Sequence, residues 1–165
     1  MAWNVLTAPN AFDNAAWAKQ SNCQITADQA TNPGGVTQDA DELELQGSSA
    51  RAFGQKYTPG AAPNGQKWSF GIWVKSDTAY TLRVTMGDQT DPLNAGTATD
   101  TTVTNHSILG DEKWHYHEAV HTFSAGSNTA ISANVFLVAT TGALIHIAWA
   151  RLKRDGFHHP VRRAL

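Results

Sequence analysis

The segment His117-Glu118-Ala119-Val120-His121 matches the pattern H-E-x-x-H. On a helix, the two histidines of this pattern bind zinc from one face, and the glutamate acts as general base on the metal-bound water. Such a site needs a third protein ligand, but Asp155 is the only acidic residue after Glu118. Ser124 also stands where the longer zinc-peptidase pattern has glycine. The sequence therefore leaves a zinc hydrolase as a remote alternative, and we expect the chain not to be an enzyme.

The same segment also fits a β-strand, in which successive side chains point to opposite faces. His115, His117 and His121 would then project from one face, opposite Trp114, Tyr116, Val120 and Thr122. Neutral imidazoles are good zinc ligands, but His117 and His121 would lie about 13 Å apart at strand rise, too far for one metal ion. We therefore expect solvent-facing histidines, no bound metal and no cofactor.

A small acidic cluster precedes one of the expected strands. Asp39, Asp41 and Glu42 could hold a structural Ca²⁺ through their oxygens or form a solvated turn, and the sequence leaves both open. Cys23 is the only cysteine, so no internal disulfide can form. The sequence contains no serine-hydrolase elbow, phosphate loop or dinucleotide fingerprint.

Trp73 is the first candidate for contact with a ligand. It has the opposite parity to Trp68 and the other apolar residues of 68–74, so it should point away from the core that they form. An outward tryptophan next to Lys75 suits a sugar ring or a protein surface, unless a loop covers it. We expect Tyr57 and Arg83 to flank this face.

Charge is unevenly distributed along the chain, whose formal net charge is −2. Residues 1–150 hold seven of the 12 basic and 13 of the 14 acidic residues, so they sum to −6. The last fifteen residues sum to +4, from Asp155 and five cations: Arg151, Lys153, Arg154, Arg162 and Arg163. An acidic body makes nucleic acid a poor partner. The basic end is either an arm that docks on an acidic surface or a solvated terminus.

The elements that must position these residues are strands. Period-two alternation is strongest at 68–75, 80–86, 131–138 and 145–150, where Trp149 shares a face with Ile145 and Ile147. Weaker strands are expected at 23–27, 43–46, 51–57 and 101–108, separated by turn-forming stretches such as Asn32-Pro33-Gly34-Gly35. The sequence therefore predicts an all-β antiparallel sandwich of eight or nine strands with little helix. It shows no signal peptide and no membrane-spanning run.

The order of these segments resembles jelly-roll, carbohydrate-binding-module-like domains of tailed-phage structural proteins. The resemblance runs from Asn4 to Gly156 and rests on four stretches: Asn4–Trp17, Trp68–Lys75, Glu112–Val138 and Ile145–Leu152. It implies a jelly-roll domain over 11–152, with an N-terminal arm at 1–10 and a basic C-terminal arm at 153–165. Arg151-Leu152-Lys153-Arg154 departs from the pattern, which usually closes on an acidic residue.

The resemblance implies a non-enzymatic virion protein, made in the host cytoplasm and carried on the outer surface of a phage particle. The first expectation is a capsid decoration or cement protein. It would bind the major capsid protein or other virion subunits and self-associate as a dimer or trimer. The alternative is a carbohydrate-binding module or tail accessory protein that recognises host surface glycan through Trp73. No membrane partner is expected.

Overall fold

A computed structural model describes residues 4–47, 53–88, 100–124, 129–138 and 141–155. These residues form ten β-strands and no helix. The strands are β1 (Ala18–Lys19), β2 (Cys23–Ala30), β3 (Ala40–Leu45), β4 (Phe53–Tyr57), β5 (Lys67–Lys75), β6 (Ala79–Gly87), β7 (Thr101–Leu109), β8 (His115–Thr122), β9 (Ile131–Val138) and β10 (Leu144–Arg154). Nine of them lie where strands were expected, and the tenth is the two-residue β1.

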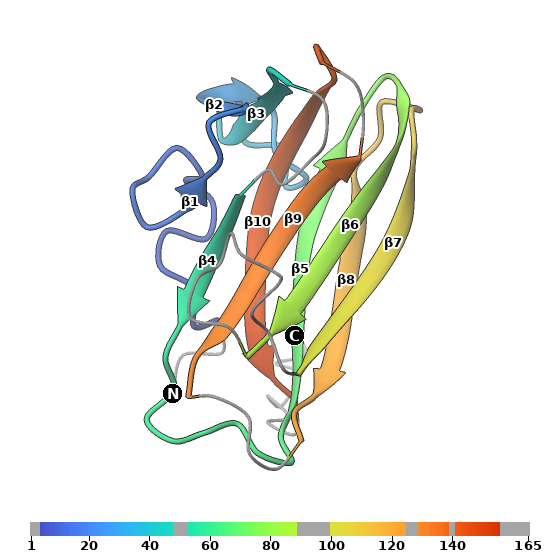
Figure 1. Ribbon diagram of the computed structural model, residues 1–165. Coiled ribbons are helices and arrows are strands. Elements are labelled where there is room, and N and C mark those ends of the chain that lie inside the picture. The colour runs from blue at the N-terminus through green and yellow to red at the C-terminus, as the bar shows by residue number, and fades with distance from the viewer. Residues whose placement is uncertain (1–3, 48–52, 89–99, 125–128, 139–140, 156–165) are drawn as a thin grey trace, which may run out of the picture.

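The strands form two five-stranded antiparallel sheets that pack face to face (Figure 1). One sheet has the order β1-β4-β9-β6-β7, and the other has the order β2-β3-β10-β5-β8. Strands far apart in sequence are neighbours in both sheets, as in a Greek-key sandwich. This architecture confirms the prediction of an all-β jelly-roll sandwich.

The core lies between the sheets and follows the period-two pattern. On β5, Trp68, Phe70, Ile72 and Val74 are all buried, whereas Trp73 between them is half-buried on the outer face. Burying apolar side chains stabilises the fold by roughly 25 cal/mol per Å² of surface removed from water. The inward-facing residues of β5 thus belong to the core, together with buried residues from the other strands of both sheets.

Residues 4–17 complete the core before the first long strand begins. The rings of Phe12, Trp17 and Phe53 pack together with centroid distances of 4.9–5.4 Å. The buried Asp41 carboxylate on β3 accepts a hydrogen bond of 2.6 Å from the Phe12 N–H. These contacts hold the N-terminal segment against the sandwich.

The two predicted arms meet the described structure at their inner ends. The Val5 N–H donates to the Leu152 carbonyl (3.1 Å), and the Ala150 N–H donates to the Pro9 carbonyl (2.7 Å), so residues 4–9 lie alongside β10. β10 extends to Arg154, two residues beyond the expected end of the domain. Residues 1–3 and 156–165, which include Arg162 and Arg163, lie outside the described residues. Docking of either arm on a shell stays a prediction.

Candidate functional site

A groove of about 670 Å³ crosses the outer face of the β10-β5-β8 part of the second sheet. Its floor comes from the sheet, and one wall comes from the N-terminal segment. The lining consists of Asn4, Pro9, Asn10, Trp73, Tyr116, Glu118, Trp149, Ala150, Arg151 and Lys153. A concave surface with aromatic rings and a few polar groups is the usual form of a small-ligand site.

Two aromatic rings form the centre of the floor. Trp73 on β5 pairs in register with Tyr116 on β8, and their ring centroids are 5.5 Å apart. On its other side Trp73 pairs with Ala148 of β10. Trp73 therefore points outward, as its parity predicts, and it lines the groove.

Gly71 makes room for Tyr116 on this floor. A Cβ atom at position 71 would lie 2.3 Å from the Tyr116 hydroxyl oxygen and 2.4 Å from its Cζ atom. Tyr116 lies across the strand at this point because the glycine leaves the outer face hollow. Burial, followed by the negative charge of Glu118, raises the pKa of the Tyr116 hydroxyl to about 12, against a smaller opposing effect of Arg151.

Replacing Gly71 by alanine is expected to displace the Tyr116 ring and to weaken ligand binding about three- to tenfold. That range corresponds to the ~0.5–1.5 kcal/mol contributed by one aromatic contact. Gly60→Ala is the matched control, because a Cβ atom at position 60 has no neighbour within 4 Å. Isothermal titration with a small molecule that binds the groove measures the effect. Equal affinities for both variants would show that the position of Tyr116 does not matter.

Trp149 lines the groove and sits at a β-bulge. The register between β10 and β5 shifts between Ala148 and Arg151, which places an extra residue on β10. Trp149 has a φ of 44°, in the left-handed region that L-residues rarely adopt. Its indole is 36% exposed and borders Gly34, where a Cβ atom would lie 2.6 Å from Cη2 of the indole. The expectation that Trp149 faces the core with Ile145 and Ile147 is therefore wrong.

The N-terminal wall is tied to β10 by side-chain hydrogen bonds. The Asn4 side-chain amide donates to the Ala150 carbonyl (3.0 Å), and its carbonyl oxygen accepts from the Leu152 N–H (3.1 Å). These two bonds continue the main-chain contacts of Val5 and Pro9 with the same strand. The N-terminal wall is therefore fixed to the floor and does not depend on a bound ligand for its position.

Charged side chains lie on both sides of Gly71. Gly71 pairs with Arg151 of β10 on one side and with Glu118 of β8 on the other. Lys153 pairs with Ser69, two residues further along, so it shares the outer face with Arg151. The Lys153 Nζ atom lies 3.7 Å from a carboxylate oxygen of Asp155. Arg151, Lys153 and Arg154 thus belong to β10, and the first two line the groove with Trp73.

Two residues predicted to flank Trp73 lie elsewhere. Tyr57 ends β4 in the other sheet, and its ring packs 5.8 Å from that of Trp68. Arg83 lies on β6, also in the other sheet, and its Nε donates to the Asn105 side chain (3.2 Å). The predicted placement is wrong because parity gives the face of a residue within its own strand, but not the sheet to which that strand belongs.

The H-E-x-x-H segment lies on β8, where its members alternate between two environments. His117 is 7% exposed on the inner side of the strand, while Glu118 lines the groove on the outer side. A zinc-peptidase arrangement, with both histidines and the glutamate at one site, is therefore absent from this strand. No group of three or more metal-binding side chains is found among the described residues.

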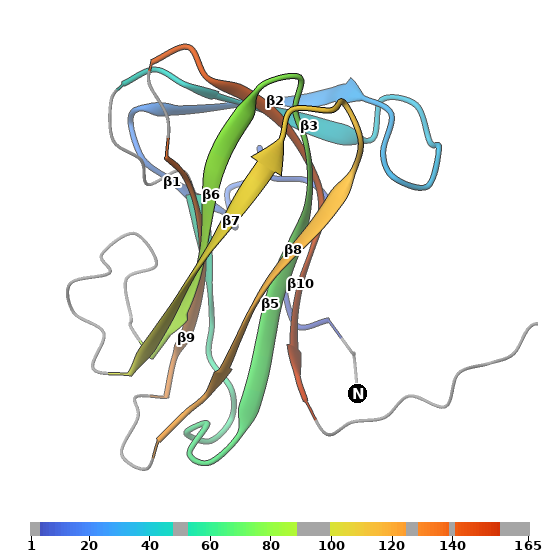
Figure 2. The ribbon, with the colours of Figure 1, turned by 90° about the vertical axis from the view of Figure 1, so that its right-hand side faces the viewer.

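His117 and His121 face the seam between the two sheets, so the expectation that they face solvent is wrong, whereas His115 stays partly exposed. β7 and β8 are the edge strands on the same side of the sandwich (Figure 2). There the rings of His106 and His117 are 5.0 Å apart, and His106 Nε2 contacts the Glu118 carbonyl (3.1 Å). These contacts join one sheet to the other.

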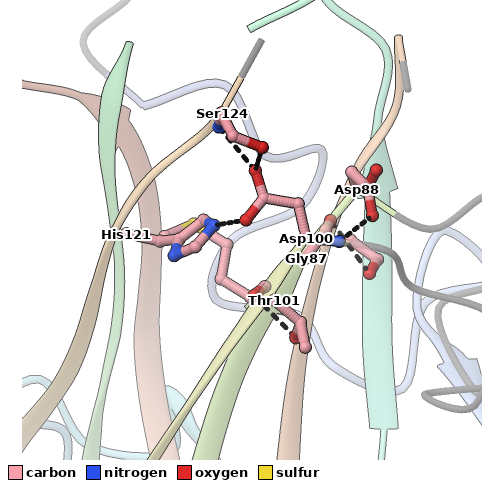
Figure 3. A network of polar contacts seen from close by, with 8 residues as sticks. Gly87, Asp88, Asp100, Thr101, His121 and Ser124 are labelled. Atoms are coloured by element: carbon pink, nitrogen blue, oxygen red, sulfur yellow. Dashed lines mark hydrogen bonds and ion pairs between the residues drawn. The ribbon is translucent and has the colours of Figure 1, made fainter. Parts of the chain in front are cut away.

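A polar network closes the other end of this seam (Figure 3). One Asp100 carboxylate oxygen lies 2.7 Å from His121 Nε2, and the other accepts bonds from the Ser124 N–H (2.5 Å) and hydroxyl (2.9 Å). The Asp100 N–H donates to the Asp88 side chain (3.0 Å). His121 is thus held by the carboxylate of the residue that directly precedes β7 of the other sheet, in a structural role.

Burial of His117 predicts a loss of stability in acid. Burial, followed by the charges of His106 and His115, lowers the pKa of His117 from 6.5 to about 4. Between these pH values the unfolded chain binds a proton that the folded chain does not. The contribution of His117 to the free energy of unfolding is therefore fully present above pH ~6.5. It is lost as the pH falls toward 4, which lowers the stability by about 1–3 kcal/mol.

His117→Leu is expected to remove that part of the pH dependence, because leucine does not titrate. The substitution should not cost a hydrogen bond, since no described group hydrogen-bonds His117 Nε2. Urea unfolding of the wild type and the variant at pH 7, 5.5 and 4.5 measures it. The loss of unfolding free energy on acidification should be smaller in the variant. An equal loss in both proteins would assign the acid sensitivity to other groups.

The acidic cluster does not converge on a single site. Asp41 is buried and accepts from the Phe12 and Asp28 N–H groups, and burial is the main cause that raises its pKa. The Asp39 carboxylate accepts from the Asn32 side chain (2.5 Å), while Glu42 lies 3.6 Å from His146. The three carboxylates thus have separate partners, and the buried Asp41 does not lie in a solvated turn.

Cys23 has no feature of a reactive thiol. It is buried, and burial raises the pKa of its thiol to about 12. A nucleophilic cysteine needs a lowered pKa. The described residues also include no helix of the length and apolarity that a membrane crossing requires.

Tyr116, Glu118 and Trp149 line the groove but were not expected there. The alternation along β8 already placed Tyr116 on the face opposite the histidines, so its side of the strand was predictable. Its contact with Trp73 was not predictable, because it depends on the pairing of two strands. Trp149 gave no such signal, because a bulge reverses parity without a mark in the sequence.

Comparison with known proteins gives a fold and no sequence family. No protein-family profile matches this chain, and no curated protein resembles it significantly in sequence. Several solved structures share the fold. The xylan-binding CBM22-1 domain of Paenibacillus barcinonensis Xyn10C is 11% identical, with a TM-score of 0.60 over 88% of this chain and 91% of that domain. TmCBM61, solved with β-1,4-galactotriose, is 15% identical, with a TM-score of 0.56 over 92% of this chain and 99% of that one.

Larger proteins contain the same fold as one part. The enzymatically active domain of bacteriophage CBA120 tailspike protein 4 is 16% identical, with a TM-score of 0.65 over 92% of this chain. This chain spans 21% of that protein and 26% of the MgGH51 α-L-arabinofuranosidase, which is 20% identical. At these identities the likeness establishes the fold class, the jelly-roll sandwich of carbohydrate-binding modules.

Proposed function

We propose that this chain is a carbohydrate-binding domain whose binding site is the groove on the β10-β5-β8 face. The observation that carries this proposal is the lining itself: Trp73, Tyr116 and Trp149 form an aromatic surface beside Arg151 and Glu118. A sugar ring presents an apolar face of C–H groups and a rim of hydroxyl groups. Aromatic rings bind the first, and charged or amide side chains bind the second.

Two further observations support binding without hydrolysis. Among the described residues, Glu118 is the only carboxylate in the groove lining, whereas glycoside hydrolysis usually needs a pair of carboxylates on either side of the bond. The solved structures with this fold include carbohydrate-binding domains of similar size, among them the xylan-binding and galactotriose-bound examples.

The direct test is binding of the purified chain to a panel of immobilised polysaccharides. Trp73→Ala should abolish retention on any polymer that holds the wild type. Val120→Ala is the matched control, because Val120 is an exposed residue of the same sheet that does not line the groove. Retention that Trp73→Ala leaves unchanged would move the site away from the groove, and retention on no polymer would contradict the proposal.

We propose a second function, a place on a phage particle, which the shared fold of the phage tailspike domain favours. In this proposal the chain is carried on the virion surface, bound to the capsid or tail as a dimer or trimer. Co-sedimentation with particles that lack the protein tests it. The truncated comparison should end after Asp155, because β10 continues to Arg154. Absence of saturable binding by the full chain would contradict this proposal and leave the glycan site untouched.

A further inference from the structure

The groove differs in charge from the rest of the chain. Residues 1–150 sum to −6, from seven basic and 13 acidic side chains. The lining has two cations, Arg151 and Lys153, and one acid, Glu118. The surface that contains the aromatic rings is therefore positive on a body that is negative.

The opposite charges lie on opposite sides of the groove. Arg151 and Lys153 are two positions apart on the same face of β10, which at strand rise is about 6.6 Å. Glu118 lies on β8, on the far side of Gly71. The β10 side, beside the N-terminal wall, is thus the cationic side, and the β8 side is the acidic side.

Acidic neighbours only partly neutralise the cationic side. Asp155 lies 3.7 Å from the Lys153 Nζ and 3.6 Å from the Lys67 Nζ, so one carboxylate is shared between two ammonium groups. Glu118 is the one acid among the described residues that line the groove. Among the described residues of this part of the outer face, Lys67, Arg151 and Lys153 therefore exceed the carboxylates of Glu118 and Asp155 by one charge.

We propose that the groove selects anionic glycans, in which a sugar carboxylate lies over the Arg151–Lys153 side while the ring packs on Trp73 and Tyr116. This inference rests on the proposed carbohydrate-binding function and adds the chemical class of the ligand. A guanidinium and an ammonium group bind a carboxylate through charge-assisted hydrogen bonds. A neutral sugar at the same place would remove water from both cations without supplying an acceptor of equal strength, so it is disfavoured.

The experiment uses uronic-acid polymers (polygalacturonate, alginate and hyaluronan) and the same polymers after reduction of their carboxyl groups. Reduction keeps every linkage and removes only the charge. We expect the full chain to bind at least one native polymer, and to bind its reduced form about tenfold more weakly, the effect of one strong charge-assisted contact. Raising the salt concentration should weaken binding to the native polymer.

Substitutions assign the effect to the two cations. Lys153→Gln and Arg151→Gln should each remove most of the difference between the native and reduced polymers. Lys56→Gln is the control, because Lys56 is exposed on β4 of the other sheet. Circular dichroism checks that each variant is folded. If Arg151→Gln does not fold, Lys153→Gln alone tests whether the cations cause the preference for the native polymers.

The outcomes separate this inference from the proposed function. Equal binding to native and reduced polymers, or binding only to neutral members of a wider panel, would overturn the selection of anionic glycans and keep the groove as a glycan site. Binding to no polysaccharide would overturn both. Preference for the native polymers that survives both substitutions would place the selecting charge elsewhere.

Discussion

Trp149→Gly and Trp149→Ala are both expected to weaken glycan binding about tenfold or more. The glycine variant should nevertheless be the more stable of the two, with a free energy of unfolding about 1 kcal/mol higher than that of the alanine variant. Both substitutions remove the indole that lines the groove. They differ in the backbone, because position 149 has a φ of 44° at a β-bulge. An L-residue in this region is strained by roughly 1–2 kcal/mol, and glycine is not.

The order of the two stabilities is the informative result, since glycine in an ordinary strand is less stable than alanine. Urea unfolding gives the free energies, and titration with the bound polymer gives the affinities. Equal free energies of unfolding for the alanine and glycine variants would show that the backbone at the bulge is not strained. Unchanged affinity in both variants would remove Trp149 from the site. Strain kept at a residue that lines a groove is the pattern expected of a functional position.

Phe12→Ala should lower the free energy of unfolding by about 3–5 kcal/mol, the usual cost of removing a fully buried phenylalanine side chain. The ring is fully buried and packs on Trp17 and Phe53. The ring anchors the segment that leads to the groove wall, and alanine would keep only the second anchor, the main-chain N–H bond to the buried Asp41 carboxylate. We therefore expect weaker binding as well as lower stability.

Two comparisons sharpen this prediction. Phe12→Leu keeps most of the buried volume and should lose less stability, while Val36→Ala, at a residue 56% exposed, should change little. Denaturant unfolding and titration are performed on the same samples. A large loss of stability with unchanged affinity would show that Asn4, Val5 and Pro9 hold the wall on β10 without help from Phe12.

Secondary structure and the facing of most strands could be predicted from sequence because both depend on neighbours in the chain. The alternation of Trp68, Phe70 and Ile72 with polar or small residues places one face of β5 in the core. The same rule placed Trp73 outside. The rule failed at Trp149, because a β-bulge interrupts the period-two alternation there. It also failed for His117, because the sequence does not show that the other sheet covers that side of β8.

The sequence by itself determined a single all-β sandwich, the outward position of Trp73, and an acidic chain with cations concentrated near its end. Each of these follows from period-two patterning or from composition, which need no knowledge of distant contacts. Only the tertiary structure decided the site. Pairing of β5 with β8 places Tyr116 beside Trp73, and pairing with β10 turns Arg151 and Lys153 from part of a basic tail into the side of a groove. Strand order is set by contacts between residues far apart in the chain, and no local pattern encodes them.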